Sequence, residues 1–450
     1  MDSKYKYSKY NIINEVNEGK VVYNTLSGIC SLLEEEDLKI FDNIETKKLD
    51  NMTPIEIDIL DNLLLNNFIV PKDIDETVVF EEKYNSMRNN QENLIMTVVP
   101  TLNCNFECNY CFQGKLKDNK VMSEEVQDGI FQLIQNYSNN LRNVSLTWFG
   151  GEPTIAMNVV RRLSDKIIPY CDKNGINYTS MIVSNGYTCT PELMGELYAR
   201  RVKTVQITLD GAKEVHDSIR YLKGSKKGSF DKIISNIRSY TDIYPIFTTI
   251  RVNVDQNNYK SIYRLIDQLA DSGLSNKNVS IYFAPIISSN SLCHHISNQT
   301  LELSDFAGIE SELRRYAHSK GLCGTSLPMQ YMGLCGATRP KGFVVTPVGN
   351  IHKCWETVSY LDKSVGNVLS TPPLNENVKL WDEWSPFNYE ECRNCIILPN
   401  CVGFCPYKFL YHSEFMGNSG NLPCPSLKYN INEKIMDHVK LKGLIKNEDL

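Results

Sequence analysis

The chain has 450 residues, of which 42% are hydrophobic, and its formal net charge at pH 7 is −6. A chain of this length is expected to fold into two to four structural units, and its acidic balance gives no indication of wholesale nucleic-acid binding. No apolar run approaches the roughly 18 residues that cross a bilayer, and the polar N-terminus lacks the apolar region of a signal peptide. We therefore expect a cytoplasmic protein with no nucleic acid and no membrane among its partners.

Cysteine is the unusual part of the composition. The chain has 15 cysteines, and they are concentrated in two short stretches, residues 104–111 and 392–405. A reducing cytoplasm disfavours structural disulfides. Clustered thiols in such a compartment are better explained as ligands of metal ions or iron–sulfur clusters.

Residues 1–80 are expected to form a small winged-helix-like module. Residues 11–16 and 20–25 alternate between polar and apolar side chains, and the Asn-Glu-Gly turn between them predicts a β-hairpin. The Thr-Pro-Ile-Glu segment at 53–56 combines an N-cap, a proline at the first helical position and a capping-box glutamate, so a helix is expected to run from it to about Asn66.

After a charged, polar stretch at residues 73–93, which is interpreted as a linker, strands alternate with helices from Leu94 onward. Six such repeats imply a parallel sheet, because each parallel connection needs a crossover helix. Residues 94–290 are therefore expected to form an α/β domain, either a partial (β/α)6 TIM-like barrel or a doubly wound sheet. The candidate strands cover residues 94–100, 144–149, 178–184, 203–209, 246–254 and 279–284, and the candidate helices cover 123–137, 157–173, 191–201, 230–240 and 259–272.

Unusual polar and glycine-rich residues end or follow the candidate strands. Ligands bind at the carboxyl ends of the strands in both a barrel and a doubly wound sheet. These residues are therefore expected to gather at one face of the sheet and to form a cofactor site there. In strand order they are the cysteines from 104 to 111, Gly150-Gly151-Glu152-Pro153, Ser184-Asn185-Gly186, Asp210-Gly211, Arg251 with Asn253, and Ala284-Pro285.

Cys104, Cys108 and Cys111 place three thiolates on one short loop. A structural zinc site normally has four ligands, and no histidine lies nearby to complete one. A four-iron cubane held by three cysteines leaves one iron free, and the amine and carboxylate of an amino acid could chelate that iron. This spacing, with Tyr110 and Phe112 beside the third cysteine, resembles the radical S-adenosylmethionine (SAM) superfamily; a zinc knuckle is the alternative.

The resemblance implies a [4Fe–4S] cluster on these catalytic cysteines, reductive cleavage of SAM, and hydrogen abstraction by the resulting 5′-deoxyadenosyl radical. The loop after the second strand resembles the motif that binds the methionine amino group, for which backbone carbonyls or the glutamate could act as acceptors. The residues after the third and fourth strands could bind the ribose hydroxyls or the carboxylate, and Arg251 could pair with the carboxylate; each also fits a plain turn or a polar core edge. The candidate cofactor-binding residues are thus Gly150, Gly151, Glu152, Pro153, Ser184, Asn185, Asp210 and Arg251.

Beyond about residue 320 the alternation of strands and helices stops. The cysteine spacing of residues 320–425 resembles the SPASM extension of radical SAM peptide maturases, whose seven thiolates hold two auxiliary [4Fe–4S] clusters. Three clusters and SAM are therefore the cofactors that the resemblance implies; two zinc sites are the alternative. Cys323 could be a further ligand of an auxiliary cluster. Residues 426–450 are expected to be a C-terminal tail. By resemblance, Cys392, Cys395, Cys401 and Cys424 hold one auxiliary cluster, and Cys335, Cys354 and Cys405 hold the other.

The resemblance covers almost the whole chain and implies a radical SAM peptide maturase. Residues 1–80 resemble, by size, position and element order, the leader-recognition module of such enzymes, which binds an extended leader peptide along a sheet edge; a structural cap is the alternative. The implied partners are a precursor peptide with a leader and a low-potential electron donor, flavodoxin or ferredoxin.

The expected reaction is a crosslink in the peptide, with a cysteine thioether as the first choice and a carbon–carbon crosslink as the second. Anaerobic sulfatase maturases carry an Asp directly after the cysteine that matches Cys354. Trp355 stands here instead, which argues against a sulfatase-maturase-like enzyme. A polyferredoxin-like electron carrier is a candidate from a different class, and a zinc-based binding module is a third. Of these candidates, only the enzymes would convert SAM to 5′-deoxyadenosine.

Overall fold

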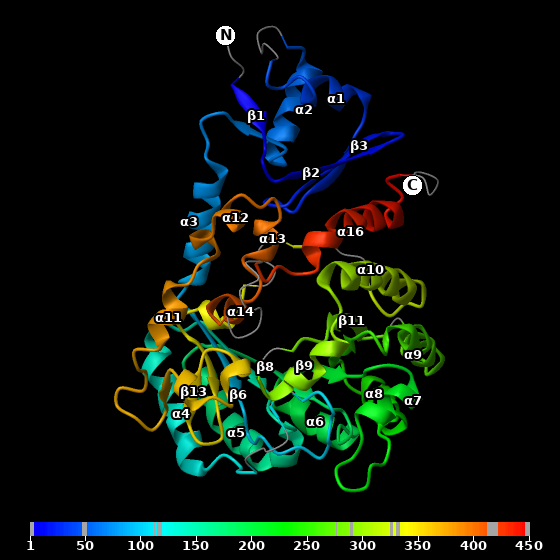
Figure 1. The fold of residues 1–450 in the computed structure, drawn as a ribbon. Coiled ribbons are helices and arrows are strands. Elements are labelled where there is room, and N and C mark those ends of the chain that lie inside the picture. Colours follow the sequence, from blue (N-terminus) through cyan, green and yellow to red (C-terminus); the bar gives the residue numbers. More distant parts are fainter. Residues whose placement is uncertain are drawn as a thin grey trace.

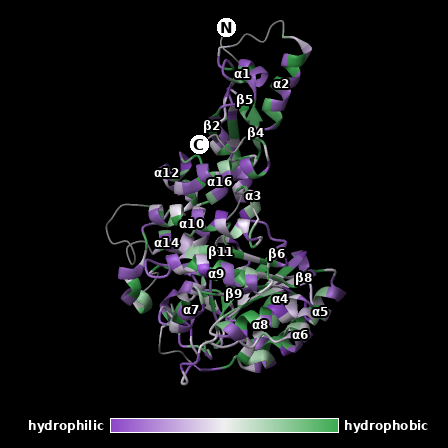
Figure 2. Ribbon diagram, turned by 90° about the vertical axis from the view of Figure 1, so that its right-hand side faces the viewer, coloured by the Kyte–Doolittle hydropathy of each residue, from purple (hydrophilic) through white to green (hydrophobic). Residues whose placement is uncertain are grey.

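The computed structural model describes residues 4–46, 52–111, 113–114, 119–275, 277–288, 291–324, 327–329, 334–411 and 422–445. Figure 1 shows three layers along the long axis of the molecule. The N-terminal module lies at the top, the large sheet and its helices lie at the bottom, and the C-terminal helices lie between them. Figure 2 shows the same order of layers after a turn of 90°.

A nine-stranded sheet forms the largest part of the molecule. Its parallel strands are β6 (Asn93–Val98), β7 (Asn143–Trp148), β8 (Asn177–Ser184), β9 (Val202–Thr208), β10 (Phe247–Val254) and β11 (Val279–Pro285). Neighbours in sequence are neighbours in the sheet all the way from β6 to β11. A doubly wound sheet would reverse its order at a switch point. The order is therefore that of a partial (β/α)6 barrel, and the barrel prediction is confirmed.

Three short strands extend this sheet beyond β6. They are β12 (Gly342–Val345), β13 (Asn350–His352) and β14 (Gly366–Asn367). β12 runs parallel to β6, and β13 and β14 follow in antiparallel pairing. The cysteine-rich region beyond residue 320 is thus joined to the barrel by a continuous hydrogen-bonded sheet.

Helices cover the parallel strands. They are α4 (Glu124–Tyr137), α5 (Met157–Lys173), α6 (Pro191–Ala199), α7 (Lys213–Ile219), α8 (Phe230–Thr241), α9 (Tyr259–Asp271) and α10 (Leu303–Ser319). On α5, Val160, Leu163 and Ile167 are buried at helical spacing, and on β7, Leu146 and Trp148 are buried at the two-residue spacing of a strand. The sequence did not predict α7, because seven residues are too few to show a helical period.

The N-terminal module combines two small antiparallel sheets with three helices in its described part. Its elements are β1 (Tyr5–Tyr7), β2 (Asn11–Val16), β3 (Gly19–Asn24), β4 (Cys30–Leu33), α1 (Glu35–Phe41), α2 (Pro54–Leu65), β5 (Ile69–Pro71) and α3 (Glu76–Arg88). β1 pairs with β5, and β3 lies between β2 and β4. The predicted hairpin is present as β2 and β3. The predicted helix is α2, and Thr53 and Glu56 exchange the hydrogen bonds of its capping box.

The linker predicted at residues 73–93 is wrong, because this segment contains α3. Asp75 caps the helix with its side chain. Phe80 and Tyr84 are fully buried at a spacing of one helical turn, but the charged residues between them made the segment look polar throughout. Arg88 donates hydrogen bonds to three backbone carbonyls of the cysteine-rich region. The segment therefore connects the module firmly to the rest of the molecule.

The tail predicted at residues 426–450 contains a helix, α16 (Leu427–Leu441), and residues 446–450 lie outside the described part of the chain. α16 packs on α10 through the partly buried ion pair of Lys434 with Glu310 (3.0 Å), and its apolar face shares a buried cluster with β2 and β3. Among the described helices, none is both long enough and apolar enough to cross a bilayer. The short helices of this region are α11 (Val378–Glu383), α12 (Glu390–Arg393), α13 (Leu398–Cys401) and α14 (Pro406–Leu410).

Candidate active site

The cysteine loop after β6 lies against the segment that follows α7. Glu107 donates its backbone N–H to the carbonyl of Tyr221 (3.1 Å), and Lys223 donates its own to the carbonyl of Asn105 (2.8 Å). These two hydrogen bonds hold the loop at the carboxyl edge of the barrel. This is the edge at which the strand pattern predicted a cofactor site.

The three thiols of this loop lie close enough to influence one another. The pKa of the Cys108 thiol is raised to about 11, chiefly by burial, and the neighbouring Cys104 and Cys111 thiols contribute to the rise. Such thiols lose their protons when iron binds, because the metal replaces the proton as the counter charge. Three of them on one loop fit a [4Fe–4S] cluster with one open iron. Phe112, which the sequence placed beside the third cysteine, lies outside the described residues.

The loop after β7 packs directly on the backbone of the cysteine loop. Gly151 donates its backbone N–H to the carbonyl of Thr101 (3.1 Å), and Glu152 donates its own to the carbonyl of Asn103 (2.9 Å). A Cβ atom on Gly151 would lie 2.1 Å from the carbonyl oxygen of Asn103, and one on Gly150 would lie 2.5 Å from that of Thr101. Only glycine permits so close an approach. The two glycines therefore set the distance between the two loops.

Glu152 is fully buried and accepts four hydrogen bonds from its own chain. The donors are the backbone N–H and the hydroxyl of Thr154 (3.1 and 2.6 Å), the hydroxyl of Ser184 (2.9 Å) and the backbone N–H of Asn185 (2.7 Å). Burial raises the pKa of this carboxyl group, and the hydrogen bonds oppose the rise. Pro153 is buried behind it and opens a short 3-10 turn. The carboxylate thus joins the loops after β7 and β8 and is not a free acceptor for an ammonium group.

Asn185 is the residue of the β8 loop that reaches the cysteine loop. Its side-chain Nδ2 donates to Oδ1 of Asn105 (2.7 Å) and lies 3.8 Å from Sγ of Cys104. N–H groups beside ligand sulfurs tune the reduction potential of a cluster. Ser184 instead donates to Glu152. The structure therefore brings Asn185, but not Ser184, to the cysteines.

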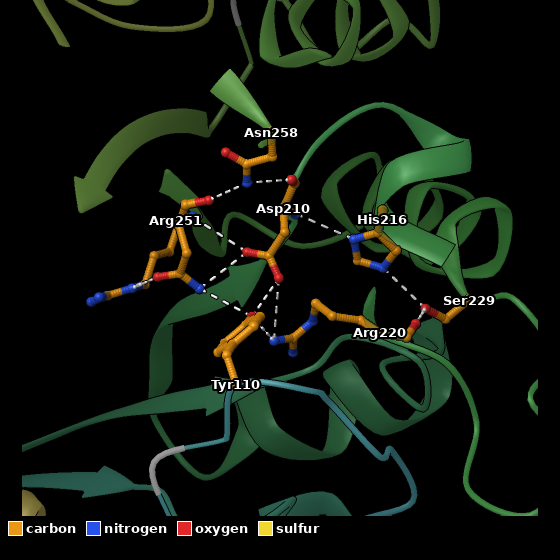
Figure 3. Close-up of polar contacts among 8 residues, drawn as sticks. Tyr110, Asp210, His216, Arg220, Ser229, Arg251 and Asn258 are labelled. Atoms are coloured by element: carbon orange, nitrogen blue, oxygen red, sulfur yellow. Dashed lines mark hydrogen bonds and ion pairs between the residues drawn. The ribbon is translucent and has the colours of Figure 1, made fainter. Parts of the chain in front are cut away.

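Asp210 lies at the centre of a polar network that joins the cysteine loop to the ends of β9 and β10 (Figure 3). Tyr110 donates its hydroxyl proton to the fully buried carboxylate of Asp210. Arg220 donates to the Tyr110 hydroxyl (2.6 Å) and lies 3.7 Å from the carboxylate. Nδ2 of Asn253 donates to both Asp210 (3.0 Å) and Tyr110 (3.1 Å). Asp210 therefore holds Tyr110 and Arg220 in place beside the cysteines.

The two arginines at this edge point in different directions. Arg251 donates from Nε to Oδ1 of Asn253 (2.8 Å), and Figure 3 shows its side chain directed away from Asp210. Arg220 lies near enough to Cys108 that its positive charge opposes the effect of burial on the pKa of that thiol. Of the two, Arg220 is therefore the better placed to meet a negatively charged group bound at the cysteine loop.

The seven cysteines of the C-terminal region form two groups, and within each group the thiols influence one another. Burial raises the pKa of the Cys354 thiol well above its usual range, and the other two thiols of its group raise it further. Burial raises the pKa of the Cys401 thiol to about 12, and the other three thiols of its group contribute. The first group is Cys335, Cys354 and Cys405, and the second is Cys392, Cys395, Cys401 and Cys424.

Within the described residues, no three His, Cys, Asp or Glu side chains converge at the spacing of a single metal ion. The iron and sulfide atoms of a cubane lie between its ligands and keep them farther apart than the ligands of one zinc ion. That the thiol groups hold iron–sulfur clusters therefore stays a prediction. Cys323 has a different environment, because its thiol donates to the carbonyl of Arg314 (3.3 Å).

The cysteine-rich region meets the loop after β7 at Trp355. This residue follows Cys354, and its ring centroid lies 5.7 Å from that of Phe149, which precedes Gly150. Trp355 is 48% exposed, whereas the other tryptophans are at most 4% exposed. The side chain that stands in place of the sulfatase maturases' Asp therefore forms an aromatic contact between two candidate cofactor sites.

A model of the radical SAM superfamily matches residues 98–281. The chain therefore contains a radical SAM domain over these residues. The match begins in β6 and ends in β11, so the radical SAM domain contains the cysteine loop and the loops after β7, β8, β9 and β10. The cofactors of the superfamily are a [4Fe–4S] cluster and SAM, and the cysteine loop has the ligands that fit such a cluster.

Curated relatives of the radical SAM domain differ in how much of the chain they match. A cysteine-type anaerobic sulfatase-maturating enzyme from Clostridium novyi is 30% identical over 177 residues, which are 37% of this chain and 46% of that protein. The radical SAM cyclopropyl synthase TigE from Paramaledivibacter caminithermalis is 21% identical over 88% of this chain and 89% of TigE. The mycofactocin maturase MftC from Mycolicibacterium smegmatis is 26% identical over 68% of this chain and 76% of MftC. The first match thus spans less than half of that relative.

Solved radical SAM structures share the fold well beyond the barrel. The enzyme anSMEcpe with bound AdoMet and the Cp18Cys peptide has a TM-score of 0.57 at 17% identity, over 78% of this chain and 98% of that one. Streptococcus suis SuiB bound to the precursor peptide SuiA has a TM-score of 0.52 at 14% identity, over 93% of this chain and 99% of SuiB. At these identities the likeness concerns the fold alone.

Arg220 is a residue of the radical SAM domain that sequence reasoning missed. The available signal was the Asp-Gly pair followed by His216 and Arg220, which lie one helical turn apart. His216 accepts the backbone N–H of Asp210 at Nδ1 (3.3 Å), and its Nε2 lies 3.0 Å from the Ser229 hydroxyl. This buried histidine fixes the same network, as Figure 3 shows.

Proposed function

We propose that this radical SAM enzyme crosslinks a ribosomally made precursor peptide. Its named relatives include two maturases and a cyclopropyl synthase, and two solved relatives hold peptides. The observation that carries the proposal is the presence of three separate thiol groups in one chain. The sheet of the barrel continues through β12 and β13, which lie between Cys335 and Cys354 along the chain. SAM cleavage alone needs only the first of these groups.

Residues of this chain would hold three [4Fe–4S] clusters, one at the radical SAM loop and one at each C-terminal thiol group. Together with SAM, the first cluster supplies a radical that removes a hydrogen atom from carbon, and the auxiliary clusters supply an electron acceptor for ring closure. Asn185 donates toward Cys104, and Gly151 keeps the loop after β7 against the cysteine loop. The packed loops hold the reacting groups in one arrangement.

The bond that we propose first is a thioether between a cysteine sulfur and a carbon atom of the peptide. An enzyme like the sulfatase maturases would carry an acidic residue after Cys354, and Trp355 cannot accept a proton there, because the indole N–H is only a donor. A carbon–carbon crosslink is the second candidate. One observation favours it: the alignment with TigE, a cyclopropyl synthase, covers 88% of this chain, and closing a cyclopropyl ring joins two carbon atoms.

The leader of the peptide is proposed to bind the N-terminal module, residues 1–80, as a strand added to β4. β4 pairs with β3 on one side, and no described strand pairs with its other side. Asn24 donates to the carbonyl of Ile29 opposite it (2.9 Å). Because hydrogen-bonded pairs alternate along an antiparallel ladder, Cys30 and Leu32 direct their backbone N–H and C=O groups outward. An added strand would use these groups.

The remaining partner is proposed to be a low-potential electron donor, flavodoxin or ferredoxin. Cubane potentials extend down to about −700 mV, so the radical SAM cluster needs a strong one-electron reductant. A reducing cytoplasm provides such donors and keeps thiols available as ligands. We accordingly propose a radical SAM core at residues 94–290 and an auxiliary-cluster region at residues 320–425 that work in that compartment.

The test is a reaction of the anaerobically reconstituted full chain with SAM, dithionite and the short cysteine-containing peptide encoded next to its gene. We expect 5′-deoxyadenosine and a peptide that is lighter by two hydrogens for each crosslink. Alkylation with iodoacetamide distinguishes the bonds, because a thioether removes an alkylatable thiol and a carbon–carbon crosslink does not. Iron clusters without 5′-deoxyadenosine would indicate a polyferredoxin-like carrier, and zinc in place of iron would indicate a binding module; either result overturns the proposal.

A further inference from the structure

One buried polar atom beside the radical SAM cysteine loop has no partner. Gln113 follows Cys111 by two residues, and its exposed fraction is only 5%. Nε2 of its side chain donates a hydrogen bond to the carbonyl of Gly150 (3.1 Å). Oε1 of the same side chain has no hydrogen-bond partner among the residues that the structure describes. Buried amide oxygens are nearly always hydrogen-bonded, and this one, unlike the unpartnered Oε1 of Gln127 on α4, lies beside the cysteine loop, where a ligand could bring the donor.

The carbonyl of Gly150 determines which way the Gln113 amide points. A carbonyl only accepts hydrogen bonds, so the amide nitrogen must face Gly150 and the oxygen must lie on the other side of the group. The next residue, Gly114, lies beside Leu292, because a Cβ atom on it would meet that side chain at the ordinary contact distance of 3.5 Å. The unpaired oxygen is therefore held beside Gly150.

The two buried carboxylates of these loops are already engaged. Glu152 accepts four hydrogen bonds from the chain. Asp210 accepts from Tyr110 and Asn253. Among the described side chains, the buried acceptor that remains next to Gly150 is Oε1 of Gln113. Gly150 belongs to the loop after β7, and this loop resembles the motif that binds the methionine amino group of SAM.

We propose that Oε1 of Gln113 accepts a hydrogen bond from the amino group of the SAM methionine while Nε2 holds the Gly150 carbonyl. An amine has more than one N–H, and a carbonyl oxygen has two lone pairs, so both Gly150 and Gln113 can meet the same amine. This role rests on the radical SAM domain alone and does not depend on the peptide that the enzyme modifies. Gln113 is then a binding residue that takes the part first expected of Glu152.

Two substitutions separate the acceptor from the donor of this side chain. Gln113→Met keeps the length of the side chain and removes both groups, whereas Gln113→Glu keeps an acceptor, removes the donor and adds a negative charge. The equilibrium dissociation constant of SAM is measured on the anaerobically reconstituted full chain without a reductant, so that no turnover occurs. We expect Gln113→Met to weaken SAM binding about tenfold and Gln113→Glu to stay within about threefold of the wild type.

A second ligand and a matched variant provide the controls. 5′-Methylthioadenosine has the adenosine end of SAM without the amino acid, so Gln113→Met should leave its binding unchanged. Gln127 has the same chemistry elsewhere: it is 2% exposed, its Nε2 donates to the Met122 carbonyl (3.0 Å), and its Oε1 has no described partner. Because Gln127 lies on α4 and does not contact Gly150, Gln127→Met should leave SAM binding unchanged.

The outcomes are separable. Unchanged SAM affinity in Gln113→Met overturns the proposal. Equal weakening by Gln113→Met and Gln113→Glu also overturns it, because the donor to Gly150 would then carry the effect. A parallel loss of 5′-methylthioadenosine binding would place the defect at the adenosine end or in the fold, and that result counts against the proposal too. The comparison of two ligands within one variant does not depend on the overall stability of that variant.

Discussion

Replacing Gly151 by alanine should disable the radical SAM site and leave the two C-terminal thiol groups intact. The new Cβ atom would lie 2.1 Å from the carbonyl oxygen of Asn103 and 2.3 Å from that of Leu102, whereas an ordinary contact begins at 3.4 Å. The loop after β7 and the cysteine loop must therefore separate by about 1.3 Å, the difference between 3.4 and 2.1 Å. Neither neighbour is a flexible side-chain end, so the backbone itself has to move.

This displacement has a cost that can be estimated. The hydrogen bonds of Gly151 with Thr101 (3.1 Å) and of Glu152 with Asn103 (2.9 Å) would be stretched beyond their range. Each contributes about 1 kcal/mol, and overpacking adds about 1–3 kcal/mol. A shift of about 1 Å in a group that positions the reaction can reduce a rate about 100-fold. We therefore expect SAM cleavage to fall at least about 100-fold.

The assay is the yield of 5′-deoxyadenosine with dithionite and SAM, together with the iron content of the reconstituted protein. Gly308→Ala is the matched control, because no heavy atom lies within 4 Å of its added Cβ atom and alanine is favoured over glycine inside a helix such as α10 by about 0.5–1 kcal/mol. That variant should cleave SAM like the wild type and be at least as stable. Wild-type cleavage by Gly151→Ala would refute the role given to the close contact of the two loops.

Three further predictions concern the thiol groups and the module. Cys104→Ala should abolish SAM cleavage, because three thiolates are needed to hold a cubane with one open iron; retained 5′-deoxyadenosine formation would exclude this loop as the cluster site. Cys395→Ala should keep SAM cleavage within about threefold of the wild type yet form no crosslinked peptide, and full product by mass spectrometry would show that its thiol group is dispensable. Leu32→Pro removes an outward N–H of β4 without breaking a hydrogen bond to β3. It should therefore weaken binding of a labelled leader peptide, measured by fluorescence anisotropy, about tenfold. Leu32→Ala keeps that N–H and should bind the leader peptide nearly as tightly as the wild type. Equal binding by the two Leu32 variants would contradict strand addition at this edge.

The local sequence pattern predicted the strands of the barrel correctly, but it did not predict the helix that connects the N-terminal module to the barrel. Each candidate strand from residue 94 to residue 284 overlaps a strand of the sheet, because alternation within a strand and repetition along the helices are visible in the sequence itself. α3 was taken for a linker because its buried face, with Phe80 and Tyr84, is narrow and surrounded by charge. The composition of a segment counts all of its residues, whereas the burial of a helix depends only on the residues of one face.

The direction of individual polar side chains was the part that pattern could not supply. Glu152 and Arg251 were reasonable ligands by position, yet Glu152 is occupied by Thr154, Ser184 and Asn185, and Arg251 turns away from Asp210. Arg220 meets the cysteine loop instead. Whether an acceptor is free depends on the donors around it, and those donors come from several loops.

The sequence alone determined the features that depend on residues close together in the chain. These are the spacing of Cys104, Cys108 and Cys111, the order of strands and helices, and the presence of glycines after the second strand. The tertiary structure decided which groups are satisfied and which remain available, as for Tyr110 and Asp210, which meet across 100 residues of chain. The physical reason is that periodicity and spacing report the local conformation of the backbone, whereas hydrogen-bond satisfaction is a property of the packed loops and exists only after they have come together.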